Sequence, residues 1–283
     1  MSSHAAHALP APTLVIEPSG RVPRLNVREL WSYRGLLWFL VWRDVKVRYA
    51  QTAIGAAWAV LQPLLTMLIF SVIFGRFARV PSGGVPYPVF ALAALVPWTY
   101  FASAVTASSN SLTANTNLIT KVYFPRLVVP VAAALAGLLD LAVAFGFLAA
   151  AMVAYGIAPA PVVFLVLPAA LAAMLLTVVG AGCWLAALNI QYRDVRLLVP
   201  FLTQIWMYLS PVIYPLSLVP ERYRALYVLN PMVGVIEGLR AGLLRTGAVP
   251  WGAIGLSFAV GAALLASGAL YFRRSERIFA DVA

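Results

Sequence analysis

The chain consists of long apolar runs that alternate with short polar or Pro- and Gly-rich segments. About 20 apolar residues in a helix, at about 1.5 Å each, cross a hydrocarbon core of roughly 30 Å. Each long run therefore predicts a membrane-spanning helix, and the expected fold class is an all-α integral membrane protein. The six predicted spans are residues 50–75, 89–112, 127–155, 162–188, 197–216 and 249–272.

The segment 36–49, just before the first span, mixes charges with aromatic rings. Its large apolar positions recur at i, i+4, i+7 and i+11, which places them on one helical face: Trp38, Trp42, Val45 and Tyr49. Its charged residues are Arg43, Asp44, Lys46 and Arg48. We expect an amphipathic helix in the membrane interface, with rings in the acyl boundary and cations toward anionic headgroups.

Three further segments do not fit a spanning helix. Residues 1–34 are Pro- and Ala-rich and predict a flexible cytoplasmic tail. Residues 218–246 are too interrupted and too charged to span, so they predict short re-entrant or interfacial helices in one leaflet. Within them Glu237 and Arg240 are expected on the helix side opposite the apolar positions. The stretches 113–126 and 189–196 are polar islands between spans.

Composition supports the membrane assignment. Hydrophobic residues make up 63% of the chain and charged residues 10%, with a mean hydropathy of +0.90, which excludes an ordinary soluble domain. The net charge of +11 does not indicate nucleic-acid binding, because the cations lie at the ends of apolar runs. They are concentrated before the first span, in the two islands and after the last span, which predicts that both termini are cytoplasmic. No cleavable signal peptide is expected, so the first span would target the chain to the membrane.

Residues for enzyme chemistry are sparse. The one cysteine, Cys183, lies in an apolar run, so neither a disulfide within the chain nor a metal site is expected. No HExxH motif or paired acidic motif occurs. The phosphate loop GxxxxGK[ST] is also missing, so the chain cannot hydrolyse ATP alone. We therefore expect no catalytic residues, metal or cofactor in this chain.

Asp140 lies within a predicted span, where a lone carboxylate costs roughly 2.5–3.5 kcal/mol on insertion scales. Either it faces a pathway through the protein or pairs across helices, or it is protonated or hydrogen-bonded to a neighbouring helix of small residues. The island 117–126 also has two interpretations, a short helix that docks on a cytoplasmic partner or an ordinary loop. The pattern alone favours the loop.

Beyond composition, an ordered set of residues resembles the membrane subunit of type-2 ABC exporters of lipid-linked polysaccharides, the O-antigen, capsule and teichoic acid export family. The set covers about residues 35–283. It begins with Arg43-Asp44-Val45-Lys46-Val47-Arg48-Tyr49, Gln51-Thr52, Gly55, Trp58 and Leu61-Gln62-Pro63-Leu64. It continues with Pro97-Trp98, Phe101, Asn117, Leu118, Lys121, Phe124-Pro125-Arg126, Asn189, Arg193-Asp194, Ser210-Pro211-Val212-Ile213-Tyr214, Asn230-Pro231, Glu237, Arg240 and Phe279-Ala280-Asp281.

The resemblance implies a homodimer of six-helix subunits in the bacterial inner membrane. Two copies of a separate ATP-binding protein would hold ATP and Mg, and a lipid-linked polysaccharide would pass along the seam between the permease subunits. Segment 36–49 would be the interface helix and segment 115–126 the coupling helix, which favours docking over an ordinary loop. The implied ATPase-coupling residues are Asn117, Leu118, Lys121, Tyr123, Phe124, Arg126, Arg43, Asp44, Lys46 and Arg48.

Two further sets of residues follow as hypotheses. Aromatic rings suit the C–H faces of sugars, although core packing explains each ring taken singly. The candidate pathway residues are Trp58, Gln62, Trp98, Tyr100, Phe101, Trp206, Tyr208 and Tyr214. The short helices 218–246 would close the exit, with Asn230, Glu237 and Arg240 as outer-gate residues.

Three alternative functions would each require particular features of the sequence. A type-2 permease for a drug or lipid would share most of these features. A membrane enzyme acting on lipid-linked sugars would need clustered acids or histidines, and the predicted outer face offers only Glu221 and Glu237. An ion channel would need charged rings or a carbonyl filter, for which no motif is seen.

Overall fold

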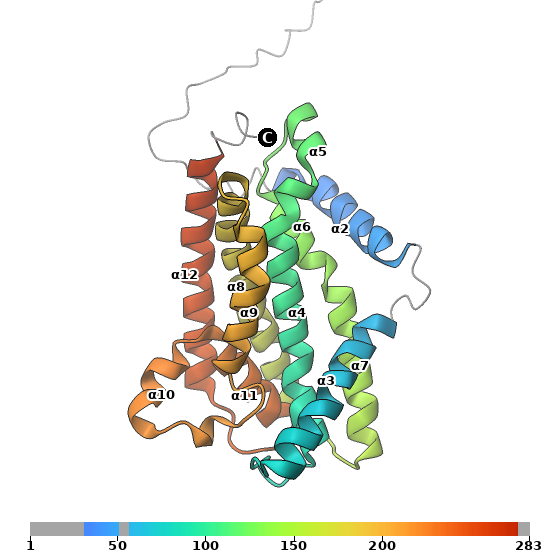
Figure 1. The fold of residues 1–283 in the computed structure, drawn as a ribbon, viewed down its shortest axis with the longest axis vertical. Helices are drawn as coiled ribbons and strands as arrows, with labels where there is room; N and C mark the ends of the chain where they lie inside the picture. Colours follow the sequence, from blue (N-terminus) through green and yellow to red (C-terminus); the bar gives the residue numbers. More distant parts are fainter. Residues whose placement is uncertain (1–30, 51–56, 277–283) are drawn as a thin grey trace, which may run out of the picture.

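The computed structural model describes residues 31–50 and 57–276, which form a bundle of helices joined by turns (Figure 1). Within this part of the chain there is no strand. Five helical stretches in it are long and apolar enough to cross a membrane: Val60–Phe77, Tyr87–Ala114, Val128–Ala154, Val163–Gln191 and Trp251–Ser275. They coincide with five of the six predicted spans, and the prediction of an all-α integral membrane protein is confirmed.

The helices follow the predicted order of spans and islands. In chain order they are α2 (Arg34–Tyr49), α3 (Trp58–Phe70), the π-helical η2 (Ser71–Phe77), α4 (Tyr87–Ala114), α5 (Thr116–Lys121), α6 (Val128–Ala136), α7 (Leu138–Ala154), α8 (Val163–Gln191), α9 (Val195–Tyr208), the short 3₁₀ helix η3 (Leu216–Leu218), α10 (Glu221–Val228), α11 (Pro231–Leu244) and α12 (Trp251–Ser275). The first 30 residues of the predicted tail, the motif residues Gln51, Thr52 and Gly55, and the Phe279–Asp281 motif lie outside the described residues.

The predicted fifth span, 197–216, departs most from its expected bounds. Its helix α9 has 14 residues, which is about 21 Å at 1.5 Å per residue. After Tyr208 the chain turns through Ser210 and Pro211, and the carbonyl oxygens of Pro211 and Val212 accept hydrogen bonds from Arg240. Because these carbonyls serve a distant side chain, the helix does not continue to residue 216.

The centre of the bundle is α4, whose first half is enclosed by other helices. Residues 89–98 are all buried, and α4 contacts α3, α6, α7, α8, α9 and α11. A helix that is apolar on every side belongs in such a core position. Beside it, α8 and α12 approach very closely at Gly180, where an added Cβ would lie 2.5 Å from backbone atoms of Leu264 and Leu265.

The predicted third span, 127–155, is divided into α6 and α7 at Gly137. The hydroxyl of Tyr100 donates a hydrogen bond to the carbonyl oxygen of Ala134 (3.1 Å), in the last turn of α6. A Cβ at Gly137 would lie 3.1 Å from the Tyr100 ring, so the close approach of α4 favours glycine here. The junction between α6 and α7 is thus shaped by a contact from α4.

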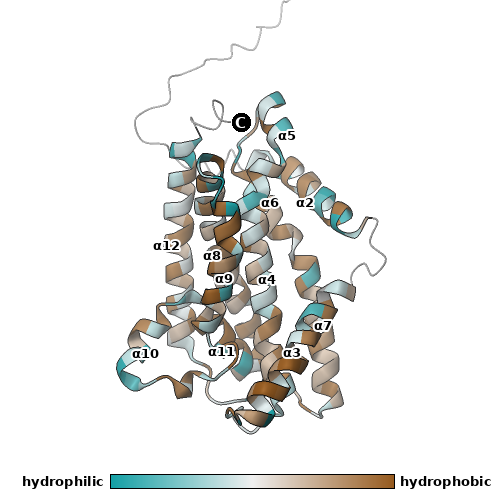
Figure 2. Ribbon diagram, in the orientation of Figure 1, coloured by the Kyte–Doolittle hydropathy of each residue, from teal (hydrophilic) through white to brown (hydrophobic). Residues whose placement is uncertain are grey.

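The polar segments gather at opposite ends of the bundle. Figure 1 shows α2, α5, the turn between α8 and α9, and the C-terminal end of α12 at one end, with α10 and α11 toward the other. Figure 2 shows hydrophilic residues at α5 and α10, whereas α3 and α9 are largely hydrophobic. The islands 113–126 and 189–196 therefore lie at the same end, as the alternation of spans requires.

Candidate functional site

The island after α4 forms α5 and the turn that leads to α6. Ile119 and Phe124 are buried in an apolar cluster that includes residues of α2, α6, α8 and α12. Asn117, Lys121 and Tyr123 are exposed, and 91% of the Tyr123 surface is accessible. The island therefore presents three of the implied coupling residues outward, while Phe124, also expected to couple, belongs to the buried base.

The other two residues of this set face inward. Leu118 packs against the same apolar cluster. Arg126 is half-buried, and its Nη1 donates a hydrogen bond to the carbonyl oxygen of Glu276 (2.9 Å), just beyond α12. Packing and this hydrogen bond together fix the island to the end of the bundle.

The helix α2 packs on α6, and its Leu40 is buried in one apolar cluster with residues of α6. Trp38 and Trp42 are exposed and stack on each other, with ring centroids 6.5 Å apart. The helix α2 extends over the whole predicted stripe, in which Val45 is buried and Tyr49 donates a hydrogen bond to Asp140 of α7. The position of this face in the membrane interface stays a prediction.

Three of the charged residues of α2 stay on their own helix. Arg43 and Asp44 form an ion pair with each other, with Nη2 and Oδ1 2.7 Å apart. Lys46 is exposed, and its Nζ lies 5.6 Å from the ring centroid of Trp42. These contacts are compatible with the docking of a partner on the three residues. That docking role stays a prediction.

The fourth charged residue, Arg48, forms an ion pair with Asp140 in the first turn of α7. The hydroxyl of Tyr49 donates a hydrogen bond to the same carboxylate. Burial and this hydrogen bond raise the pKa of Tyr49 to about 12, so the hydroxyl keeps its proton at neutral pH. Of the alternatives for Asp140, the structure shows pairing across helices.

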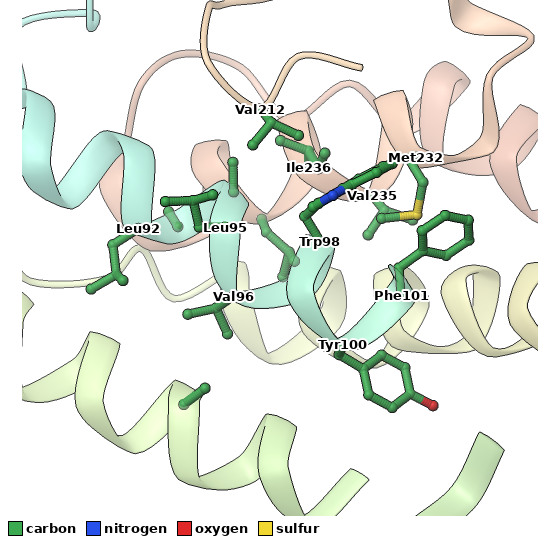
Figure 3. Packing of buried hydrophobic residues seen from close by; sticks show 14 of the residues in the cluster. Leu92, Leu95, Val96, Trp98, Tyr100, Phe101, Val212, Met232, Val235 and Ile236 are labelled. Carbon is green, nitrogen blue, oxygen red and sulfur yellow. The ribbon is translucent and has the colours of Figure 1, made fainter. Parts of the chain in front are cut away.

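Three candidate pathway residues are buried core residues in this structure: Trp98, Tyr100 and Phe101. Figure 3 shows Trp98 extending toward α11, where Met232, Val235 and Ile236 lie, whereas Tyr100 points away from them. Phe101 also meets Trp206 edge to face, with ring centroids 5.0 Å apart. These side chains have almost no accessible surface and pack in the core of the single chain in this conformation, so their role in a pathway stays a prediction.

The other candidate pathway residues lie on or near the surface of α3 and α9. Trp58 and Gln62 on α3 and Tyr208 on α9 are exposed, while Trp206 and Tyr214 are half-buried. The Tyr214 hydroxyl donates to the carbonyl oxygen of Tyr208 (2.8 Å), which holds the turn after α9 against the end of that helix. All five of these side chains keep some accessible surface in this conformation, and the largest share is on Trp58, Gln62 and Tyr208.

Asn230, a predicted gate residue, joins α9 to α11. Its Oδ1 caps the N-terminus of α11 by accepting from the backbone N–H of Met232 (3.0 Å). The same Oδ1 accepts from Nε1 of Trp206 (3.0 Å), and its Nδ2 donates to Ser210 Oγ (2.8 Å). The amide thus fixes where α11 begins relative to the end of α9.

Arg240 is 1% exposed and lies at the centre of a second polar cluster. Its guanidinium donates to the carbonyl oxygens of Pro211 (2.6 Å), Val212 (2.8 Å), Tyr214 (3.3 Å) and Phe90 (3.4 Å). It also pairs with Glu237 (3.1 Å). The carbon at the centre of its guanidinium lies 3.6 Å from the centroid of the Phe90 ring, within the range of a cation–π contact.

These contacts correct the prediction that Arg240 lies on the polar side of a leaflet helix. Almost all of α11 is buried inside the protein, and Arg240 faces the turn 210–214. Burial lowers the pKa of Arg240 to about 10, and Glu237 opposes that shift, so the side chain is charged at neutral pH. An outer-gate role for Arg240 would therefore be exerted through the turn that it holds.

Sequence reasoning missed the partners of these charged groups. The carbonyls that bind Arg240 come from a turn and from α4, and the partner of Asp140 is 92 residues away. The one local signal in the sequence was the pair of prolines Pro211 and Pro215. It indicates that the helix α9 ends near this point and leaves backbone carbonyl oxygens available to accept from a side chain.

Comparison with known proteins matches residues 35–244 to the family model described as ABC-2 type transporter. The O-antigen export system permease protein RfbA of Myxococcus xanthus is 33% identical over 219 residues, which are 76% of this chain and 82% of that protein. A protein of the same name from Klebsiella pneumoniae is 28% identical over 85% of this chain and 92% of its own length. The polysialic acid transport protein KpsM of Escherichia coli is 24% identical over 69% of this chain and 76% of its own length.

Proposed function

Since this chain belongs to the ABC-2 type transporter family, we propose that it is the permease of an exporter that moves a lipid-linked polysaccharide out of the cytoplasm. Proteins of this family are membrane subunits of transporters and not enzymes. The chain is a multi-pass membrane protein, and its family implies an ABC ATPase as partner.

The observation that carries the cargo assignment is the set of relatives. Two of them are named for O-antigen export and a third for transport of polysialic acid, and each alignment covers most of both chains. The residues 58–64 that resemble the polysaccharide branch lie at the start of α3, where Trp58 and Gln62 are exposed. Exposed aromatic and amide groups can contact a weakly charged glycan without a charged pore.

The energy source lies on the partner. The sequence has no phosphate loop, so ATP and Mg belong to two copies of a separate nucleotide-binding subunit. That subunit docks at the end of the bundle where α2 and α5 lie, and Lys121 and Tyr123 are exposed to receive it. Closure of the ATPase pair moves these helices, which is rigid-body gating by a ligand bound elsewhere.

The permease works as a homodimer in the bacterial inner membrane, with both termini in the cytoplasm. Several large apolar side chains of α9 are exposed in the single chain: Leu197, Leu198, Phe201, Leu202, Ile205 and Tyr208. Such a face suits lipid or a second copy, and the polysaccharide passes along the seam between copies. The cations at the α5 end support a cytoplasmic position for that end.

Deleting the gene tests the cargo. We expect surface polysaccharide to disappear and the lipid-linked glycan to accumulate in the cytoplasm, with export restored by the wild-type gene. Complementation with the variant Lys121→Glu should restore membrane insertion but little export, because the exposed charge is reversed where the ATPase docks. Unchanged surface glycan in the deletion strain would rule out the cargo, and full export by Lys121→Glu would rule out docking at this residue.

A further inference from the structure

The interface helix α2 is attached to two different membrane helices. Its body packs on α6, where Leu40, 1% exposed, lies in one apolar cluster with Val128, Val129 and Ala132. Its C-terminal end binds α7, because Arg48 and Tyr49 both contact the carboxylate of Asp140.

Between these two attachments lies the junction of α6 and α7 at Gly137. The carbonyl oxygen of Ala134 accepts from the Tyr100 hydroxyl, and α6 ends at Ala136. α7 begins at Leu138. Helices bend at glycine and where a side chain binds into the i to i−4 ladder, so the two segments can change their angle here. The helix α2 therefore bridges the one junction within this span.

The carboxylate is well placed to hold α2. Asp140 is the third residue of α7 and lies within one turn of the junction at Gly137. The side chains of Arg48 and Asp140 are 35% and 25% exposed, so water screens their attraction only in part. Because two consecutive residues of α2 bind one carboxylate, the end of α2 cannot slide along α7 without losing both contacts.

We propose that Asp140 is a positioning residue for transport, which makes α7 follow the end of α2 when the ATPase moves that helix. The bend is taken up at Gly137, so movement at the cytoplasmic end changes the angle between α6 and α7. This inference rests on the proposed function for its driving force, but it does not depend on which cargo is carried.

The first test measures the distance between α2 and α7 without reference to cargo. Spin labels are attached to cysteines at Val47 and Leu139, which are exposed next to Arg48 and Asp140, in a Cys183→Ser background. The full complex with its ATPase is measured without nucleotide and with trapped ATP. We expect one unchanged distance in the otherwise wild-type chain, and a longer or broader distribution with ATP in Asp140→Asn. A nucleotide-dependent distance in the wild-type chain, or identical behaviour of the two chains, overturns the proposal.

The second test measures export per ATP hydrolysed in the assembled complex. Asp140→Asn and Arg48→Gln should each lower this ratio roughly 5-fold or more, the lower end of typical couplings between sites. The charge exchange Arg48→Asp with Asp140→Arg should recover part of it. The control Glu221→Gln removes an exposed carboxylate that pairs with Arg224 at 3.6 Å, and it should leave the ratio unchanged.

Two results of this second test count against the proposal. Normal export per ATP in Asp140→Asn means that α7 does not need the contact. Equal loss of ATP hydrolysis and export in a fully assembled complex means that Asp140 only maintains the fold. If the wild-type complex hydrolyses ATP but moves no polysaccharide, the proposed cargo fails, and the distance measurement still decides the role of Asp140.

Discussion

At the scale of single residues, the charged groups inside the bundle are the most constrained. Arg240 is surrounded by carbonyl oxygens and Glu237, and Asp140 by Arg48 and Tyr49. A buried charge is tolerated when its hydrogen bonds are made and its counter-charge is near. Each of these residues therefore specifies how two or more segments of the chain are arranged.

Replacing Arg240 by methionine should destabilise the protein strongly. The change leaves the carbonyls of Pro211 and Val212 buried without their donor and leaves Glu237 without its cation, which typically costs about 3–5 kcal/mol. We expect a clearly lower apparent melting temperature in detergent and less protein in the membrane. The matched control is Arg222→Met on α10, where the arginine is exposed. Equal melting temperatures for the two variants would show that the Arg240 cluster adds nothing to stability.

At the scale of elements, close approaches between helices decide where each helix begins, ends or packs. The Tyr100 hydroxyl interrupts the span 127–155, and Arg240 binds the turn that ends α9. The pair α8 and α12 lies so close that no side chain fits at Gly180. Small residues allow such backbone contact between membrane helices, where van der Waals packing drives association.

Substituting one glycine in each of two helices tests this packing. Gly180→Ala should destabilise by about 1–3 kcal/mol, because its Cβ would meet backbone atoms at 2.5 Å that cannot rotate away. Gly255→Ala on α12 adds the same methyl group where nothing lies within 4 Å, so it should be neutral or slightly stabilising. Thermal unfolding of both variants in detergent gives the comparison. A similar loss in both would mean that the α8–α12 contact is looser than described.

At the scale of the whole molecule, the two polar ends carry different kinds of structure. One end has the exposed island of α5 beside α2, and the other has α10 and the buried α11 (Figure 1). The proposed cycle needs the first end in the cytoplasm and the second outside. Its direction depends on this orientation.

Labelling single cysteines in spheroplasts checks the orientation. A membrane-impermeant thiol reagent should modify Arg222→Cys on α10 and leave Tyr123→Cys unmodified until the membrane is opened. Both positions are exposed, and the native Cys183 is buried, so background labelling should be low. Modification of Tyr123→Cys from outside would invert the topology and remove the docking role of α5.

The sequence by itself determined the features that depend on local composition. Apolar runs long enough for a bilayer predict spans, since every segment must match the hydrocarbon thickness, and five of the six runs appear as long apolar helices. The islands, the short helices near residues 218–246 and the family resemblance were also readable, because each is a local or ordered pattern. Their proposed roles in docking and gating stay predictions.

Only the tertiary structure decided which side chains meet. Hydrophobic periodicity does not distinguish a ring that faces a pathway from one in the core, so the burial of Trp98, Tyr100 and Phe101 was not readable from the sequence. The partners of Arg240 and Asp140 come from distant segments, and local spacing carries no information about them. The reason is physical: in an apolar chain, a polar group is satisfied by whichever segment folding brings beside it.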